Sequence, residues 1–219
     1  MPAEALTVAC VWVRGNVPFT ADYVHKLRSM VGRHLATPHR FVCLTDRPDE
    51  LPGVECSPVP TPDGMFGWWS KMHLFEPGRL SGRVLYLDLD VIVMRDLRDL
   101  LVGTLSSLTL IPHAGTFQGH GMRRVVHRYN SSVMRFWAED CADLWEEWRP
   151  ELTRELWGDQ DFIGLVRPSA ALWPLRWFPR ISEVRAEPER EDEARVILCK
   201  KPKNHVAARE LQLVAKNWR

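Results

Sequence analysis

Two short apolar runs near the start of the chain flank a longer segment in which apolar residues recur with helical spacing. The runs at 7–13 and 40–44 are typical of buried strands. Between them, apolar residues at every third or fourth position over 21–36, preceded by Thr20, predict an amphipathic helix. A weaker strand is expected at 54–59. This strand–helix–strand opening predicts a βαβ unit, and therefore an α/β fold with a parallel sheet.

The rest of the chain alternates short apolar runs with polar stretches. Apolar runs predict further strands at 83–93, 108–111, 125–136 and 196–198. Helical composition and spacing predict helices at 68–75, 96–101, 137–148, 159–166 and 206–214. We expect the charged stretch 184–194 to form a surface loop, and the glycine-containing stretch 112–124 to form a mobile loop.

Two carboxylates interrupt the most apolar of these strands. Asp88 and Asp90 both lie within 83–93, and the two-residue period of a strand places them on one face, with Leu89 on the other. Buried, unpaired carboxylates are costly and repel each other. A shared divalent cation would resolve this conflict, and Mn²⁺ or Mg²⁺ suits oxygen ligands. The alternative is a strand end at which both carboxylates reach solvent or meet an arginine.

Composition narrows the class of protein. The chain has 219 residues and a net charge of +1, which fits one domain and gives no basic surface for nucleic acid. The N-terminus has no basic, signal-like region, and no apolar run is long enough for a transmembrane segment. Five scattered cysteines without a C-x-x-C pair predict reduced thiols and a cytoplasmic location.

The ends of three predicted strands carry polar or aromatic residues. These ends lie at Trp12–Arg14, at Thr45–Asp46 and at Asp88–Asp90. Ligands of open α/β sheets bind at the carboxyl ends of the strands, so this layout predicts a nucleotide site.

The order of five short motifs along the chain is informative. They are W-S-K at 69–71, Y-L-D-L-D at 86–90, Y-N-S-S-V-M at 129–134, G-D-Q-D at 158–161 and C-K-K-P-K-N-H at 199–205. Together they resemble the motifs of metal-dependent GT-A glycosyltransferases, above all glycosyltransferase family 8, which includes glycogenin and bacterial galactosyltransferases. The resemblance covers nearly the whole chain.

The resemblance implies a Rossmann-like GT-A fold with one mixed, mostly parallel sheet flanked by helices. It implies a single domain over 1–219, divided into a nucleotide-binding half (1–110), a donor-sugar and acceptor half (111–205) and a C-terminal helix (206–219). The implied reaction moves a sugar from a nucleotide-diphosphate sugar, with UDP as the family default, and retains the anomeric configuration. The acceptor stays open among a sugar, a lipid and a protein.

The resemblance also implies roles for individual residues. Asp88 and Asp90, with Leu89 between them, would hold Mn²⁺ or Mg²⁺ against the donor diphosphate. Asp159 would accept hydrogen bonds from donor-sugar hydroxyls, and Gln160 would lie beneath the sugar ring near the anomeric carbon. The other implied donor contacts are Lys71 and Asn130 to the sugar, Lys201 and Lys203 to the phosphates, and Val11, Trp12, Thr45 and Asp46 to the nucleoside base.

The sequence departs from the family pattern at two positions. Cys199 occupies the place of the histidine that completes the family's metal site, so we expect His205 to be the third ligand, with Cys199 or a water as alternatives. Ser132 stands where the family has a glycine, which adds a side chain beside the donor sugar.

Simpler or different interpretations remain for these residues. Asp161 could cap a helix, and Lys71 could be a solvated charge. Asp-x-Asp after an apolar strand also occurs in haloacid-dehalogenase-type phosphohydrolases, where Asp88 would be the nucleophile. A non-catalytic module that binds a nucleotide-sugar is the third hypothesis.

Overall fold

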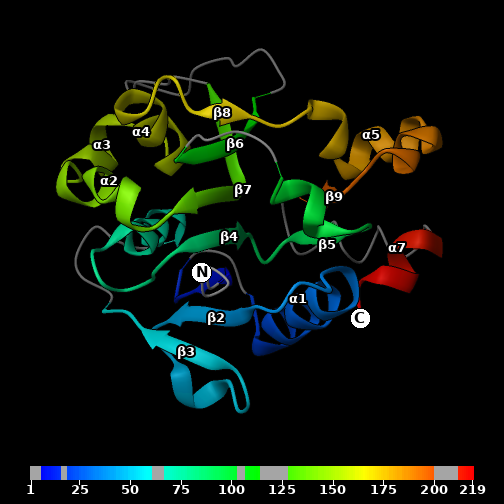
Figure 1. The fold of residues 1–219 in the computed structure, drawn as a ribbon, viewed down its shortest axis with the longest axis horizontal. Helices are drawn as coiled ribbons and strands as arrows, with labels where there is room; N and C mark the ends of the chain where they lie inside the picture. Colours follow the sequence, from blue (N-terminus) through cyan, green and yellow to red (C-terminus); the bar gives the residue numbers. More distant parts are fainter. Residues whose placement is uncertain (1–5, 16–18, 61–66, 103–106, 114–127, 200–211) are drawn as a thin grey trace.

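A seven-stranded sheet organises the protein, seen here in a computed structural model that describes residues 6–15, 19–60, 67–102, 107–113, 128–199 and 212–219 (Figure 1). The strand order is β3-β2-β1-β4-β7-β6-β8. The strands are β1 (Leu6–Trp12), β2 (Arg40–Thr45), β3 (Glu55–Pro58), β4 (Arg83–Leu87), β6 (Leu108–Pro112), β7 (Tyr129–Trp137) and β8 (Ala171–Leu172). Neighbouring strands run parallel except where β7 pairs with β4 and β6. The predicted α/β class with a mixed, mostly parallel sheet is confirmed.

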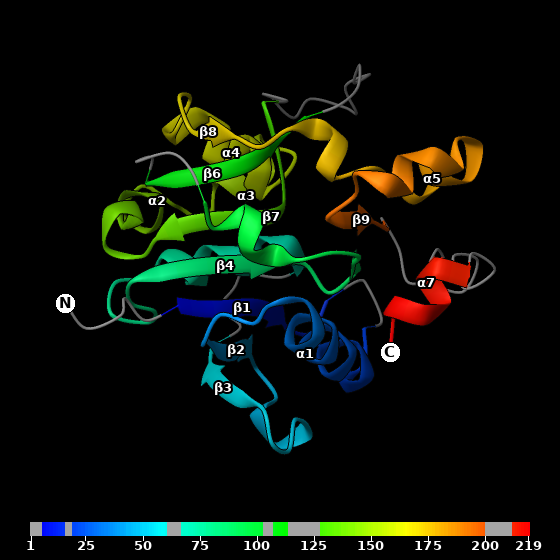
Figure 2. The same cartoon turned by 45° about the vertical axis from the view of Figure 1, so that its right-hand side comes forward.

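Helices cover both faces of this sheet. On one face lie α1 (Ala21–His34) and a two-stranded antiparallel sheet of β5 (Val91–Val93) and β9 (Val196–Leu198). The other face is covered by the 3-10 helix η2 (Gly67–Phe75) together with α2 (Asp143–Glu146) and α4 (Asp159–Val166). The remaining elements are η1 (Pro48–Glu50), η3 (Leu97–Leu100), η4 (Glu139–Cys141), α3 (Leu152–Glu155), η5 (Leu175–Trp177), α5 (Ile181–Ala186), η6 (Pro188–Asp192) and α7 (Gln212–Asn217). Both views place α5, β9 and α7 on the same side of the molecule (Figure 2), and β5 also lies on that side in Figure 1.

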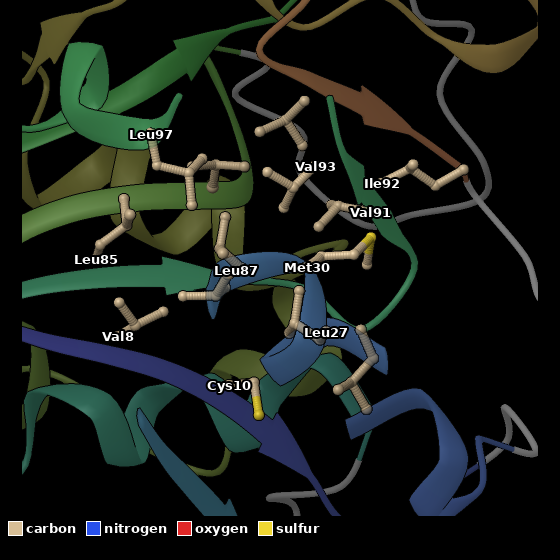
Figure 3. Close-up of a cluster of buried hydrophobic side chains, with 14 of the residues drawn as sticks. Val8, Cys10, Leu27, Met30, Leu85, Leu87, Val91, Ile92, Val93 and Leu97 are labelled. Carbon is tan, nitrogen blue, oxygen red and sulfur yellow. The ribbon is translucent and has the colours of Figure 1, made fainter. Parts of the chain in front are cut away.

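Strand alternation divides the core into two layers. On β1, Val8 and Cys10 belong to the layer under α1, whereas Ala9 belongs to the layer under η2 and α4. In the first layer, Leu27 and Met30 of α1 pack beside β4 and β5 (Figure 3). A two-residue period on strands buried on both faces produces this division, because successive side chains point to opposite sides.

The predicted strand over 83–93 is wrong as a single element. β4 ends at Leu87, and Val91–Val93 form β5, which leaves the main sheet and pairs with β9. Asp88, Leu89 and Asp90 therefore lie in the connection between two sheets. Both carboxyl groups are half-buried there, because the end of β4 reaches the edge of the sheet while Leu89 packs into the core. A sheet interior would have removed them fully from water.

Other predicted elements agree with the structure to different degrees. The stretch 184–194 is not a loop: it contains the end of α5 and all of η6, and Arg190 of η6 pairs with Glu187 just before that helix. The helix expected at 137–148 is divided into η4 and α2. Most of the predicted loop 112–124, and residues 206–211 of the predicted C-terminal helix, lie outside the described residues.

β7 contains an irregularity that affects the site. Leu110 of β6 pairs with Met134, but the next residue, Ile111, pairs with Asn130. Residues 131–133 are therefore extra on β7 relative to β6, as in a β-bulge. On its other side β7 stays bound to β4, where the Asp88 N–H donates to the Ser132 carbonyl over 2.8 Å. Ser131 and Ser132 therefore lie beside the end of β4 within this irregular stretch.

Three cysteines lie in one row across the parallel strands. Cys10 of β1 is in register with Cys43 of β2, which is in register with Cys56 of β3. All five cysteines are free, and only Cys56 is not fully buried. Among the described residues, no helix is long and apolar enough to cross a membrane.

Candidate active site

Four motif segments meet at the carboxyl end of β4 in one polar network. Lys71, on η2, places its Nζ 2.9 Å from Oδ1 of Asp88 and 3.5 Å from Oδ2 of Asp159. The Lys71 ammonium also donates to Ser131 Oγ over 3.2 Å, and Ser131 donates to Asp159 Oδ2 over 2.6 Å. Lys71, Ser131 and Asp159 are buried. The solvated-charge interpretation of Lys71 is thus wrong.

The charges of this network depend on one another. Burial acts to lower the pKa of Lys71, but the carboxylates of Asp159 and Asp88 outweigh it and raise that pKa above its ordinary value. Burial raises the pKa of Asp159, although the Lys71 charge and the Ser131 hydrogen bond oppose this. One lysine thus balances two nearby carboxylates, and the network can accommodate further positive charge.

Tyr86 fixes the first aspartate of the DxD motif from inside β4. Its hydroxyl donates to Asp88 Oδ1 over 2.5 Å, so this oxygen receives both Tyr86 and Lys71. Burial first, and the Asp88 charge second, raise the pKa of Tyr86 well above its ordinary value. The phenol therefore stays protonated and keeps its role as a donor.

Asp90 lies apart from the Lys71 hydrogen bonds. Its backbone carbonyl accepts from the Cys199 N–H over 3.1 Å, which connects the end of β9 to the DxD segment. Burial and the neighbouring Asp88 charge raise the pKa of the Asp90 carboxyl to about 8. This donor set, two close carboxylates with incomplete compensation, fits a hard divalent cation. In the described part of the chain, however, no three His, Cys, Asp or Glu side chains form a group that could hold a metal.

The predicted third ligand is not among the described residues. His205, together with Lys201 and Lys203, lies in the segment 200–211 outside them. The alternative ligand Cys199 is buried, and burial followed by the Asp90 charge raises the pKa of its thiol to about 12.

The ends of β1 and β2 form a second polar group, at the predicted nucleoside site. Asp46 accepts from the Arg14 N–H over 3.3 Å, and Thr45 Oγ1 accepts from the Arg47 N–H over 3.0 Å. The Arg47 guanidinium lies 3.9 Å from the centre of the Trp12 ring, which is buried. Of the predicted base contacts, Trp12 and Thr45 are buried and therefore support this edge from beneath. Val11 is half-buried beside them.

Two further predicted residues lie next to the network. Asn130 precedes Ser131 at the start of β7, and its Oδ1 accepts from the Ser132 N–H over 2.9 Å. Gln160 is half-buried in the first turn of α4, directly after Asp159. Gly158, which precedes α4, lies under the Trp68 indole: a Cβ at this position would be 3.2 Å from Trp68 Nε1.

Two members of the network were not predicted as site residues. Tyr86 and Ser131 both occur within the motifs, two residues before Asp88 and one after Asn130. The available signals were the Tyr86 hydroxyl within an apolar strand and, for Ser131, the polar run over 130–132 at the start of β7.

The fold has counterparts among solved structures. An active-site mutant of LgtC matches with a TM-score of 0.65 at 15% identity, over 90% of this chain and 88% of that chain. The chain has the GT-A glycosyltransferase fold. The galactosyltransferase LgtC in complex with donor and acceptor sugar analogs matches with a TM-score of 0.61 at 15% identity, over 97% of this chain and 96% of that chain.

A further GT-A match is the glycosyltransferase GlyE of Streptococcus pneumoniae TIGR4. It has a TM-score of 0.56 at 15% identity, over 90% of this chain and 55% of that chain. No family model matches the sequence, and no curated protein matches it either. The structures therefore confirm, at the level of fold, the resemblance to GT-A glycosyltransferases that the motifs predicted.

Proposed function

We propose that this protein is a metal-dependent glycosyltransferase that moves a sugar from a nucleotide-diphosphate sugar, with UDP as the nucleotide, to an acceptor with retention. One observation carries the proposal: segments far apart in the sequence, those of Lys71, Asp88, Ser131 and Asp159, form one network at the carboxyl edge of a GT-A sheet. Free cysteines agree with the proposed cytoplasmic setting.

Asp88 and Asp90 would hold Mn²⁺ or Mg²⁺, with His205 proposed as the third ligand. When bound, the cation would neutralise charge on the leaving diphosphate. Lys71 and Tyr86 orient the Asp88 carboxylate through its Oδ1. The ammonium and the phenol hold this carboxylate in place before any ligand arrives, which reduces the entropic cost of binding.

Asp159 and Gln160 are assigned to the donor sugar. Ser131 and Lys71 both contact Oδ2 of Asp159, so we assign Oδ1 to a donor-sugar hydroxyl. The Gln160 amide would stabilise positive charge on the anomeric carbon, and Asn130 would contact the sugar from the start of β7. Lys201 and Lys203 would bind the phosphates, and the Thr45–Asp46 edge would border the base.

The phosphohydrolase hypothesis is weaker because both carboxylate oxygens of Asp88 already have partners. A nucleophilic carboxylate needs an oxygen that is free to attack phosphorus. In this site both oxygens of Asp88 lie within 3.2 Å of the Lys71 ammonium, and Oδ1 also accepts from Tyr86.

Nucleotide-dependent thermal stabilisation tests the proposal. UDP, GDP, CDP and dTDP would each be added with Mn²⁺ or with EDTA to the wild-type chain and to Asp90→Asn. A ligand at a hundred times its Kd adds about 2.7 kcal/mol, which raises the Tm by roughly 5–10 °C in a domain of this size. We expect such a shift only when UDP and Mn²⁺ are both present. The Asp90→Asn variant should lose this shift.

The matched control is Asp140→Asn, because Asp140 is an exposed aspartate of η4, after the far end of β7. This variant should keep the full shift and the full transfer activity. If Asp90→Asn transfers sugar as fast as the wild type, the metal assignment is wrong. A metal-dependent shift without turnover of any nucleotide-sugar would instead support the binding-module hypothesis.

A further inference from the structure

A cavity of about 440 Å³ opens beside the candidate active site. Its walls come from the end of β6, the start of β7, and the segment from η5 to β9. In both ribbon views, α5 and β9 lie beside β6 and β7 (Figure 2). Cavities of this size commonly hold a small ligand.

Two wall residues join the cavity to the polar network. Asn130 lines it and is followed directly by Ser131, which binds Lys71 and Asp159. Leu198 also lines the cavity and is followed by Cys199, whose N–H donates to the Asp90 carbonyl. The cavity is therefore one residue away from the network along β7 and one residue away from the DxD segment along β9.

The lining has an apolar base and a charge-balanced rim. Ile111, Phe178 and Leu198 supply buried apolar surface. Three arginines and three glutamates line much of the remainder, together with His113 and Asn130. Arg176 pairs with Glu193 over 3.2 Å, and Glu183 accepts from the Arg180 N–H over 2.7 Å.

This chemistry discriminates among three kinds of acceptor group: an acyl chain, an anionic group and a neutral sugar. An acyl chain would have to desolvate the charged rim, which is costly. An anionic group would meet as many carboxylates as guanidinium groups and would gain little net attraction. A neutral sugar fits both parts, since its C–H faces suit the apolar base and its hydroxyls can pair with charged donors and acceptors.

We propose that this cavity binds the acceptor and that the acceptor ends in a neutral saccharide of one or two rings. The assignment rests on the proposed function. In the transfer, an acceptor hydroxyl oxygen forms the new bond to the donor's anomeric carbon, while the bond from that carbon to the diphosphate oxygen breaks. The electron pair of the broken bond stays on the diphosphate oxygen, which takes up the hydroxyl proton.

Two leucines provide a matched pair for the test. Leu175 lines the cavity and is 43% exposed, whereas Leu172, on β8, is 50% exposed and does not line it. Leu175→Trp adds bulk at the cavity, and Leu172→Trp makes the same change outside it. Both positions are exposed enough to accept the larger ring without repacking the core. A second cavity variant, Arg176→Gln with Glu193→Gln, removes one rim pair and adds no bulk.

Saturation-transfer NMR would measure binding of glucose, galactose, N-acetylglucosamine, lactose and maltose in the presence of UDP and Mg²⁺. Glucuronate and octanol are the anionic and lipid-like probes. We expect at least one neutral saccharide to bind the wild type and Leu172→Trp. Leu175→Trp should weaken its Kd at least tenfold, and the Arg176→Gln/Glu193→Gln variant should weaken it severalfold.

Failure of this inference and failure of the proposed function give different results. If no neutral saccharide binds, if glucuronate or octanol binds in preference, or if Leu175→Trp binds as well as Leu172→Trp, the acceptor assignment is overturned. In each of these cases the nucleotide-dependent thermal shift is still expected. Absence of that shift in the wild type would instead overturn the proposed function itself.

Discussion

Oppositely charged side chains meet in two contrasting settings in this molecule. At the end of β4, Lys71 is 9% exposed and contacts two carboxylates and a serine. At the β2–β3 edge, Arg40 is 53% exposed and pairs with Glu55. The first arrangement is removed from water, so each member depends on the others for compensation. The second is solvated, and either partner can turn to water. A pairing of opposite charges is thus needed for stability at the end of β4, whereas it contributes little to stability at the β2–β3 edge.

The largest effect should follow from removing the positive charge at the centre of the network. Lys71→Met leaves the carboxylates of Asp88 and Asp159 without their common partner, and breaking a buried pair typically costs about 3–5 kcal/mol. Urea unfolding would measure the free energy of unfolding. Lys71→Arg, which keeps the charge, should lose much less. A loss below about 1 kcal/mol in Lys71→Met would show that water reaches the network and that the burial argument fails.

A smaller effect should follow from removing one hydrogen bond of the same network. Ser131→Ala removes the hydroxyl that donates to Asp159 and accepts from Lys71, and a hydrogen bond to a charged group contributes roughly 1.5–3 kcal/mol. Ser132→Ala is the control, since the described hydrogen bonds of Ser132 run through its backbone. A double-mutant cycle of Ser131→Ala with Asp159→Asn would show whether the two residues are coupled. Equal losses for the two serine variants would contradict the assigned role of Ser131.

The exposed pair should give the smallest effect. Arg40→Ala at the β2–β3 edge should change the free energy of unfolding by no more than about 1 kcal/mol, as is usual for solvated pairs. Because salt screens such pairs, 0.5 M NaCl should reduce the difference between Arg40→Ala and the wild type further. Thermal unfolding at low and high salt would measure this. A salt-independent loss of several kcal/mol would mean that the contrast between the two settings is wrong.

Much of the fold follows from local patterns in the sequence. The apolar run of β1 and the 3.6-residue period of α1 each reflect burial within one element, so a short window contains the needed information. The strand over 83–93 failed for a different reason. Val91–Val93 are as apolar as the residues before Asp88, but their partner, β9, lies about a hundred residues later in the chain. A local pattern carries no information about such pairing.

The candidate site, like the fold, could be predicted from the sequence only in part. The motifs identified Lys71, Asp88 and Asp159, and the structure brings these three together. The contributions of Tyr86 and Ser131 depend on rotamers and on the bulge in β7, which a motif does not encode. The charged stretch 184–194 is not a loop, although most of its residues are charged and its sequence predicts one. Its first helix, α5, packs through the buried side chains of Ile181 and Val184, and the exposed Arg190–Glu187 pair adds little.

The row of cysteines across β1, β2 and β3 makes the unmodified chain a convenient reporter of its own breathing motions. A thiol reagent should modify Cys56 quickly in the native state, while Cys10, Cys43, Cys141 and Cys199 wait for local or global opening. The delay of each buried thiol then measures how often its neighbourhood becomes accessible. Cys199 reports on the strand beside Asp90, and Cys10 and Cys43 report on the centre of the sheet. The relative rates would therefore show whether the edge that carries the DxD segment opens independently of the sheet that supports it.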